Sequence, residues 1–278
     1  MNIWSVILSP DFLFTSIRVM TPILFAAMAC MVFVKGGIDP IGTEGIMLSC
    51  ALAGPVGGYF THSALGGVIF AMAVGVVLAF VFGYFTLILN TNPVLAGIAL
   101  NTLSGGLTVF TTYYLTGNKG STQSLKSPVM PEIRILVIVL TVFFWKTTVG
   151  LRIRAVGENE SAAKSVGLNV MKYKYIALLI AGCLAGIGGA YMSMGYVSFF
   201  SRDMIAGRGW IGMAAESMGL GIPWKIACSV LIFGMADSLA VRLQMLNLPS
   251  QLIQTIPYVV TMIAIGIYSK RNMSGKKN

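Results

Sequence analysis

Long apolar runs, separated by short polar or glycine-rich breaks, fill most of the chain. A helix needs roughly 20 apolar residues to cross the hydrocarbon layer of a bilayer, and most of these runs approach that length. The pattern predicts an all-α integral membrane protein. We expect about nine transmembrane or partly broken membrane helices, at residues 12–34, 42–60, 64–89, 93–115, 133–148, 175–197, 206–220, 224–241 and 252–268.

The N-terminal residues differ from a cleavable signal peptide. The first seventeen residues contain no Lys or Arg, so the positively charged region that opens such a peptide is missing. Residues 1–16 alternate apolar and polar side chains around Pro10. This stretch is expected to form an interfacial helix that leads into the first span, or to be part of that span.

Two segments contain too many glycines and prolines for simple helices, one at residues 36–58 and one at 207–223. Broken backbone at membrane depth is tolerated only where it is buried in protein or lines a cavity. One broken segment falls in each half of the chain. In transporters, such a pair indicates two weakly related halves around a central pathway. The alternative is that these glycines only allow helices to pack closely.

The composition supports a membrane location. Of the 278 residues, 56% are apolar and 10% are charged, and the mean hydropathy is +0.83. Soluble domains are about 25% charged, so an ordinary soluble enzyme, a disordered chain and a secreted disulfide scaffold are all excluded. The length leaves little room for a soluble domain. We therefore expect a single transmembrane domain over residues 1–278.

The sequence offers no set of residues for catalysis or for a cofactor. The four cysteines lie in apolar runs without a C-x-x-C pair, and one histidine cannot form a metal cluster. A phosphate-binding loop, a Ser-His-Asp set and the H-E-x-x-H motif are all missing from the sequence. No catalytic residue, metal or cofactor is predicted, and any ATP would be bound by another polypeptide.

The net charge of +10 fits a membrane protein better than a nucleic-acid-binding protein. If the chain crosses nine times with residues 150–174 and the tail inside, twelve of the 19 Lys and Arg residues lie on the cytoplasmic side. This bias predicts an outer N-terminus and a cytoplasmic C-terminus. It also places residues 116–131 in an outer loop.

Polar side chains inside the membrane segments are candidates for a substrate pathway, because they are costly there. On the fourth segment, Asn101, Ser104 and Thr108 are spaced to share one helix face, with Thr102 beside them. A neutral polar face suits an uncharged solute. The alternative for Asn101 and Thr102 is hydrogen bonding between helices.

Intramembrane carboxylates are a second group of pathway candidates. Glu44 and Glu216 are expected to act as gates or hydrogen-bond anchors. The alternative role for Glu44 is to stabilise the start of its own helix through the helix dipole. For Asp237 and Arg242, the alternative is pairing or snorkelling at a helix end.

The most informative motif lies between the fifth and sixth segments. Residues 150–167 read G-L-R-x-R-A-V-G-E-N-x-x-A-A-x-x-x-G. The middle predicts a short amphipathic helix, capped by Asn159 or Ser161 and ended by Gly167. Its small residues leave a smooth surface on which another protein could dock.

This stretch resembles the ATPase-docking loop of ABC importer permeases. The residues that carry the resemblance are Arg154, Gly157, Glu158, Ala162, Ala163 and Gly167. The wider motif is similar to the branch that imports branched-chain amino acids, simple sugars and nucleosides. The element Gly42-Thr43-Glu44-Gly45 and the stretch Gly207-Arg208-Gly209 are also similar to that branch, the latter to its nucleoside-type members. The sequence departs from the family at Glu216, where an apolar residue is usual.

The resemblance implies an ABC importer permease fold and a permease subunit in a bacterial cell membrane. Its implied partners are a second homologous or identical permease, cytoplasmic ATP-binding subunits and an extracytoplasmic substrate-binding lipoprotein. A nucleoside is the first expectation for the solute, and a simple sugar is the second. A rival function is an ion-coupled secondary transporter in which Glu44, Glu216 and Asp237 form the relay. Such a transporter would have no use for the docking loop.

Overall fold

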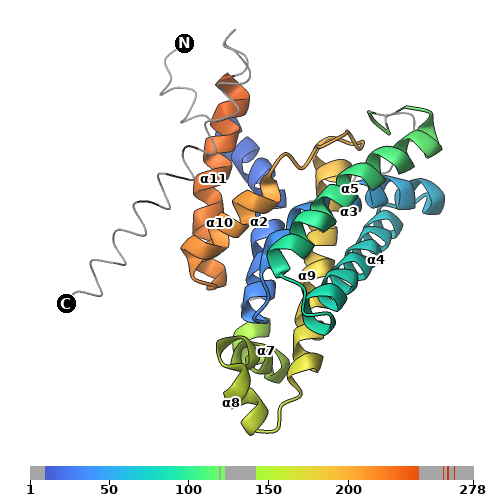
Figure 1. Ribbon diagram of the computed structural model, residues 1–278. Coiled ribbons are helices and arrows are strands. Elements are labelled where there is room, and N and C mark those ends of the chain that lie inside the picture. The colour runs from blue at the N-terminus through green and yellow to red at the C-terminus, as the bar shows by residue number, and fades with distance from the viewer. Residues whose placement is uncertain are drawn as a thin grey trace.

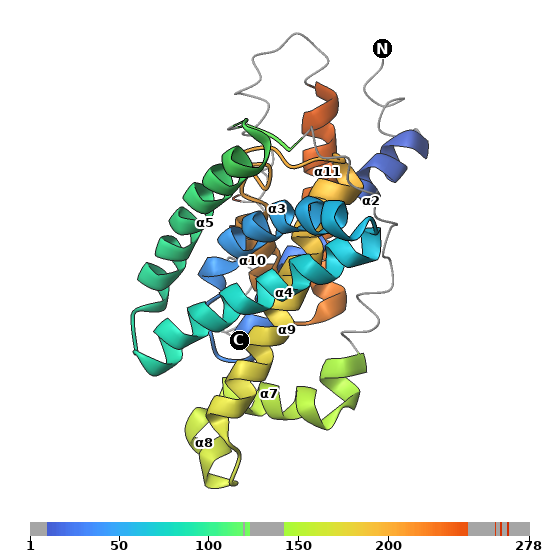
Figure 2. The ribbon, with the colours of Figure 1, turned by 90° about the vertical axis from the view of Figure 1, so that its right-hand side faces the viewer.

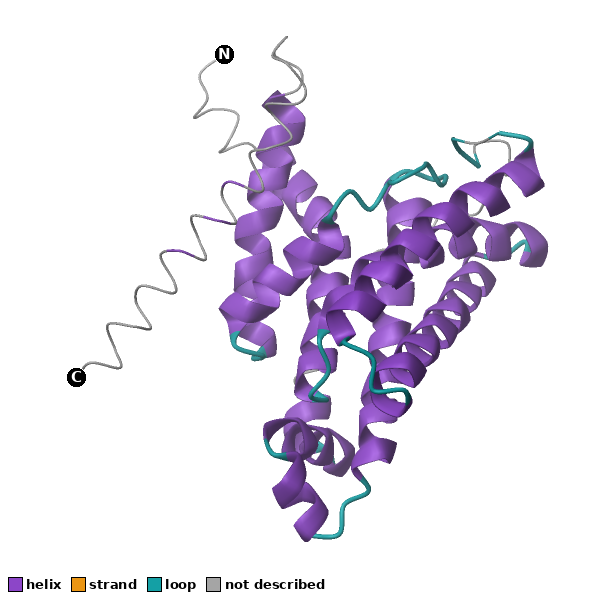
Figure 3. Ribbon diagram, in the orientation of Figure 1, coloured by secondary structure: helices purple, strands orange, loops and turns teal. Residues whose placement is uncertain are grey.

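The computed structural model describes residues 10–118, 120–122 and 142–243, together with Val259, Met262 and Gly266. Within these residues every regular element is a helix (Figure 3). The elements, labelled as in Figure 1, are α2 (Pro10–Lys35), η1 (Pro40–Gly42), α3 (Thr43–Thr61), α4 (Ala64–Gly83), η2 (Tyr84–Ile88), α5 (Pro93–Thr116), α7 (Thr148–Glu158), α8 (Glu160–Ser165), α9 (Val170–Ala190), η3 (Tyr191–Tyr196), α10 (Arg208–Gly219) and α11 (Pro223–Leu243).

Four described helical stretches are long and apolar enough to cross a membrane: Thr15–Lys35, Ala64–Ile88, Pro93–Thr116 and Val170–Tyr196. Their burial divides them into inner and outer helices. The percentages refer to the most apolar part of each stretch. That part is 78% buried in α2 and 72% buried in α9 with η3, but only 33% buried in α4 with η2 and 22% buried in α5. The centre of the molecule is therefore formed by α2, α3 and α9, while α4 and α5 lie on the outside (Figure 2).

Small residues let the helices approach one another closely, including the outer helix α4 and the inner helix α9. Where α4 crosses α9, a Cβ added to Gly182 would lie 2.5 Å from the Gly75 carbonyl oxygen and 2.8 Å from the Ala79 Cβ. This is the small-residue contact by which membrane helices pack without a hydrophobic driving force between them. Several of the glycines in these helices thus serve packing.

The structure corrects the predicted position of the first break. The second segment was expected to be irregular, but α3 runs as one α-helix through Pro55. The irregular backbone lies before it, at residues 36–42, where Gly37 adopts φ +71°. Within α3, Gly54 and Gly57 permit close contacts with Ala190 and Phe70 instead of breaking the helix.

Other predicted bounds shift by a few residues. The sixth segment begins earlier than expected, because Asn169 caps α9 by accepting a hydrogen bond from the Lys172 N–H. Residues 10–16 belong to the continuous helix α2. The predicted segments 252–268 and most of 133–148 lie outside the described residues, as do residues 1–9 and most of the loop 116–131.

The second break is a loop that leads from η3 to α10. Its start is tied to the end of the α5 loop: the Thr122 hydroxyl accepts the Phe200 N–H at 2.9 Å, and the Arg202 N–H donates to the Gly120 carbonyl at 2.9 Å. The loop then turns sharply into the short helix α10, with positive φ at Asp203, Ala206 and Gly207. The expected short seventh segment is therefore present, and its irregular part precedes the helix.

Candidate functional site

Two helix N-termini meet at the carboxylate of Glu44. The residue lies in the first turn of α3, and its Oε1 accepts the Gly207 N–H at 2.9 Å. Its Oε2 accepts the Gly209 N–H at 2.6 Å, at the start of α10. Helix N-termini carry a partial positive charge and unpaired N–H groups. One carboxylate therefore stabilises the ends of two helices, which extends the capping role considered for Glu44 to a second helix.

The approach of α10 to α3 requires glycine at two positions. Gly207 adopts φ +81°, which a residue with a side chain rarely takes. A Cβ on Gly209 would lie 2.6 Å from Glu44 Oε2 and 2.8 Å from the Glu44 Cα. The Gly-Arg-Gly sequence thus has a direct structural reason.

This junction, which we call the Glu44 joint, lies beside the middle of α2 and not at its end. One turn along α10, a Cβ on Gly212 would lie 2.6 Å from the Ala26 Cβ of α2. Ala26 is nine residues from the end of α2 at Lys35, which corresponds to about 13 Å of helix rise. The joint therefore lies beside the middle part of α2, where Glu44 and Gly207 are half-buried and Gly209 is buried.

Arg208, between the two glycines, pairs with another carboxylate. Its Nη2 lies 3.1 Å from Asp237 Oδ2 on α11, and the two side chains are 12% and 16% exposed. Nη1 also donates to the Met204 and Ile205 carbonyls. This contact agrees with the pairing considered for Asp237, with Arg208 as the cation.

Asn101 ties α5 to the first break. Its Nδ2 donates to the Ile41 carbonyl at 3.0 Å, and its Oδ1 accepts the Gly45 N–H at 2.8 Å. A Cβ on Gly45 would lie 2.8 Å from the Asn101 Cα, so the two backbones are in close contact. Both ends of the amide are thus used by backbone next to the Glu44 joint. This arrangement favours the interhelical hydrogen bonding that was the alternative for Asn101.

The other polar residues of α5 bond mainly within their own helix. The exposed Thr102 donates to the Ile98 carbonyl at 2.9 Å, and the buried Thr108 donates to the Ser104 carbonyl at 2.8 Å. The Ser104 hydroxyl is buried and has no hydrogen-bond partner among the described residues. Ser104 and Thr108 therefore lie on the inward face of α5, and Thr102 does not.

Glu216 lies at the other end of α10 from the Glu44 joint. It is seven residues beyond Gly209, about 10 Å along the helix, and only 6% of its surface is exposed. Beside it is Lys35, the last residue of α2. In the sequence analysis, Lys35 was only one of the twelve Lys and Arg residues used to orient the chain in the membrane. The signal that could have found it is the buried carboxylate itself, since such a group calls for a nearby cation.

The predicted docking helix is present as α8. Asn159 caps it by accepting the Ala162 N–H at 3.0 Å, as expected for one of the two candidate caps. Glu160 lies 3.0 Å from the Lys164 Nζ and 2.8 Å from the Lys174 Nζ. The hydrogen bond from Lys174, and then that from Lys164, lowers the pKa of Glu160. Gly167 follows the helix at φ +79° with open space around it.

The motif residues of the docking loop divide into an inward and an outward set. Arg154 stacks over the Trp145 ring at 4.4 Å, and Ala163 is buried. The backbone of Gly157 packs directly on the end of α2. Glu158, Ala162 and Gly167 are exposed, beside Val166, which is 79% exposed. Arg154, Gly157 and Glu158 belong to the helix α7, which was not predicted.

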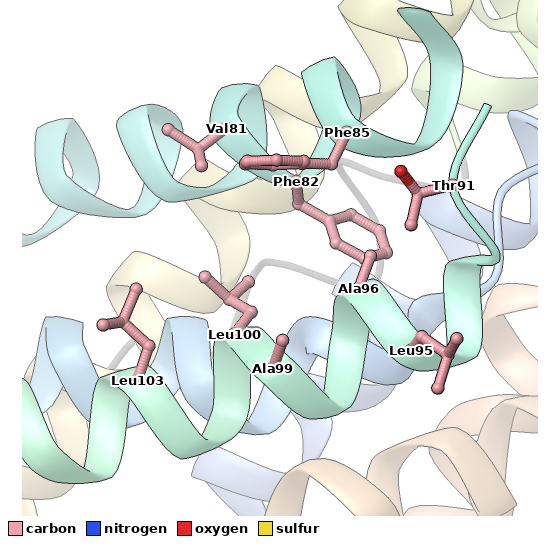
Figure 4. A pocket seen from close by; sticks show the side chains of 9 residues that line it. All are labelled: Val81, Phe82, Phe85, Thr91, Leu95, Ala96, Ala99, Leu100 and Leu103. Atoms are coloured by element: carbon pink, nitrogen blue, oxygen red, sulfur yellow. The ribbon is translucent and has the colours of Figure 1, made fainter. Parts of the chain in front are cut away.

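A pocket of 510 Å³ lies between α4 and α5 (Figure 4). Phe82 and Phe85 lie on its α4 side, and Leu100 points into it from α5. Thr91 is the one polar side chain of its lining, so the pocket is not suited to a polar solute. Its full lining is Val81, Phe82, Phe85, Thr91, Leu95, Ala96, Ala99, Leu100 and Leu103.

The sequence of the chain matches a known protein family and several of its members. The family model described as "Branched-chain amino acid transport system / permease component" matches residues 12–265. The chain is 29% identical to the nucleoside ABC transporter permease protein NupC of Lactococcus lactis, over 92% of this chain and 91% of that protein. It is 28% identical to the guanosine ABC transporter permease protein NupQ of Bacillus subtilis, again over 92% and 91%.

The fold is shared with a solved structure at low sequence identity. PsaBC from Streptococcus pneumoniae, solved in complex with Fab, superposes with a TM-score of 0.55 at 13% identity. The match covers 99% of this chain and 98% of that chain. At this identity the likeness concerns the fold alone, and it agrees with the expected architecture of membrane helices.

Proposed function

The chain belongs to the family of permease components of branched-chain amino acid transport systems, and from this membership we propose that it forms the pathway by which an ATP-driven importer carries a nucleoside. It is an ABC transporter permease of the nucleoside transporter type and a multi-pass membrane protein. A simple sugar is the second candidate solute. The finer points below, namely the solute, the partners and the orientation, are parts of the proposal.

The observation that carries the choice of an uncharged solute is the pairing of charges at the Glu44 joint. In transporters, broken helices often point their N-termini at an anionic group of the substrate. Here those N–H groups already bind the carboxylate of Glu44. Arg208 is likewise paired with Asp237. These groups leave no free charge with which to bind an ionic solute, whereas a nucleoside needs only neutral hydrogen-bonding groups.

The pathway we propose runs along the junction of α3, α5 and α10. Asn101, Glu44 and the two glycines of the Gly-Arg-Gly sequence shape its middle. Ser104 and Thr108 continue the polar inward face of α5, Thr102 lies beside them, and Glu216 stands near one end. Asn101 and Glu44 act in this proposal mainly by holding the broken backbone in place.

The exposed face of α7 and α8 is the proposed docking site for a separate ATP-binding subunit. Glu158, Ala162, Val166 and Gly167 form an exposed surface with little side-chain bulk at the tip of the molecule (Figure 1). We place this tip and the C-terminal tail in the cytoplasm, in accord with the bias of Lys and Arg. A second permease subunit and an extracytoplasmic lipoprotein complete the proposed importer in a bacterial cell membrane.

The decisive experiment is uptake into proteoliposomes that contain the permease, its ATP-binding subunits and its binding protein. Labelled guanosine or uridine is expected to accumulate only with internal ATP, with ribose as the sugar comparison. Ionophores that collapse proton and sodium gradients should leave uptake unchanged. Uptake that needs an ion gradient and no ATP would contradict the proposal and favour the ion-coupled alternative. Uptake of ribose alone would replace the nucleoside with a sugar.

A further inference from the structure

Lys35 and Glu216 reach the same glycine from two different helices. A Cβ added to Gly221 would lie 2.7 Å from the Lys35 Nζ and 3.6 Å from Glu216 Oε1. Gly221 adopts φ +64° in the turn that follows α10, so the backbone here already favours glycine. Because Gly221 has no side chain, the Lys35 ammonium group and the Glu216 carboxylate can both lie close to its backbone.

The Glu216 carboxylate has a cation nearby but no hydrogen bond and no ion pair within 4.0 Å among the described residues. Among the described residues no group donates a hydrogen bond to it, and Lys35 is the cation whose charge acts on it. A buried carboxylate that loses its counter-charge is strongly disfavoured. Because no directed hydrogen bond fixes the two groups, their separation can change while the attraction persists.

The backbone of Lys35 is also in contact with the docking segment. A Cβ on Gly157 of α7 would overlap the Lys35 carbonyl oxygen and lie 3.0 Å from the Gly37 nitrogen. Figure 1 shows α7 directly below the end of α2, with α8 beyond it. A displacement of α7 therefore acts first on the residue that carries the ammonium group.

The opposite end of α10 is fixed. Two backbone hydrogen bonds hold it to Glu44, and the Arg208 side chain holds it to α11. A helix of 12 residues is short and stiff, so a force applied at Glu216 reaches the Glu44 joint about 10 Å away.

We propose that Lys35 and Glu216 form a charge link through which movement of α7 and α8 is passed to α10 and so to the Glu44 joint. The link rests on the proposed function, in that the movement comes from an ATPase docked on α8. Lys35 and Glu216 are positioning residues: they act on the pathway through α10 and do not contact the solute.

The first test needs only the purified permease. We compare melting temperatures in detergent for the wild type, Lys35→Met, Glu216→Gln and the double variant. Lys35→Met leaves the carboxylate buried without its cation and is expected to lower the melting temperature by roughly 5 °C. The double variant should regain most of that loss. Two losses that simply add would overturn the link, because contacting residues couple and independent ones do not.

The second test uses the reconstituted importer. Glu216→Gln and Lys35→Met should keep wild-type co-purification of the ATPase but carry roughly tenfold fewer solute molecules per ATP hydrolysed, as residues on a coupling route can do. Lys35→Arg keeps the charge and should keep transport. The control is Lys225→Met, which removes a Lys that stacks on Trp224 on the neighbouring helix α11. Wild-type transport per ATP in Glu216→Gln would overturn the link.

The two tests separate the link from the proposed function. If the wild-type permease fails to retain an ATPase, the proposed function is wrong, and so is the role of the link in coupling. The melting temperatures still decide whether Lys35 and Glu216 interact. If the ATPase is retained and the variants lose neither stability nor coupling, the link alone is wrong.

Discussion

The two ends of α10 hold a half-buried and a buried carboxylate, those of Glu44 and Glu216, in opposite ways. At the first end, Glu44 accepts two backbone N–H groups at 2.9 and 2.6 Å, and the neighbouring Arg208 is paired at 3.1 Å. At the other end, Glu216 has a nearby ammonium group but no hydrogen bond from any described residue. Directed bonds fix a geometry, whereas a charge attraction tolerates movement. The comparison suggests a helix fixed at one end and adjustable at the other.

Removing the Glu44 carboxylate should have the largest effect. Glu44→Ala leaves the buried Gly209 N–H and the half-buried Gly207 N–H unpaired, where a fully buried unpaired donor costs about 1–3 kcal/mol, and it removes the charge that faces two helix N-termini. We expect the melting temperature of the purified permease to fall by roughly 10 °C and uptake to be lost. Asp203→Asn removes an exposed carboxylate from the same loop and is the control. Equal melting temperatures for the two variants would contradict a fixed joint.

Adding one methyl group at the joint tests its close packing. Gly209→Ala places a Cβ 2.6 Å from Glu44 Oε2, so α10 has to move away from α3. We expect a loss of about 2–3 kcal/mol in stability, as in overpacked cores. Gly105→Ala, in the middle of α5 with nothing within 4 Å, is the matched control and should be neutral or slightly stabilising. Thermal unfolding of both proteins measures the difference. Two equal shifts would show that Gly209 is not needed for contact.

Asn101→Leu tests whether α5 helps to hold the first break. The change removes the bonds to the Ile41 carbonyl and the Gly45 N–H, which should cost about 2 kcal/mol and slow uptake roughly tenfold. Binding of the ATPase should remain, because α8 is distant in the fold. Leu107→Val, on the exposed side of α5, is the control. Wild-type uptake and stability in Asn101→Leu would show that the break is held without this amide.

Bulk at Gly167 should affect docking with little effect on the fold. Gly167→Asn tolerates the positive φ and adds a modest side chain, whereas Gly167→Trp adds strain and a large group on the exposed surface. We expect co-purification of the ATPase to fall about tenfold with Trp and less than twofold with Asn, since contact interfaces reject bulk more than small polar groups. If Trp leaves co-purification unchanged, the exposed face of α8 is not the docking site.

The smallest expected effect concerns the exposed ion pairs of α8. The lysines lower the pKa of Glu160 below its usual value of 4.5, so their stabilisation is present above pH 4.5 and is lost as the pH falls through the lowered pKa. Comparing wild type with Glu160→Gln should show a small difference in melting temperature at pH 7 that persists at pH 5. The difference should shrink as the pH falls below 4.5 and vanish once the pH lies below the lowered pKa. A difference that disappears already at pH 6 would contradict this assignment.

The four described spans were predictable because the bilayer requires long apolar helices. The short helix α8 was also predictable, since Asn159 and Gly167 mark its ends by local chemistry. The helix α7 was missed because Gly150 and Gly157 made the stretch look like a loop. Those glycines in fact permit close contacts with Phe144 and Lys35.

The partners within the site could not be predicted, because they lie far apart in sequence. Glu44 and Gly209 are 165 positions apart, and Asn101 and Gly45 are 56 apart. The polar residues themselves stood out in apolar segments, but the sequence cannot say whether an amide faces a solute or a backbone carbonyl. Pro55 shows the reverse case: a residue that usually breaks helices lies within an uninterrupted one.

The most direct test of the central claim measures the two ends of α10 separately. Spin labels are placed at Trp210 and Leu220, each paired with a label at Val77 on α4, after Cys183 and Cys228 are replaced by Ser. All three labelled positions are exposed. Pulsed electron resonance then gives both distances with and without ATP, in the complex with the ATPase. We predict that the Val77–Leu220 distance changes while the Val77–Trp210 distance stays within 2 Å, about the width of a label's own spread. Equal changes at both ends, or no change at Leu220, would contradict the account.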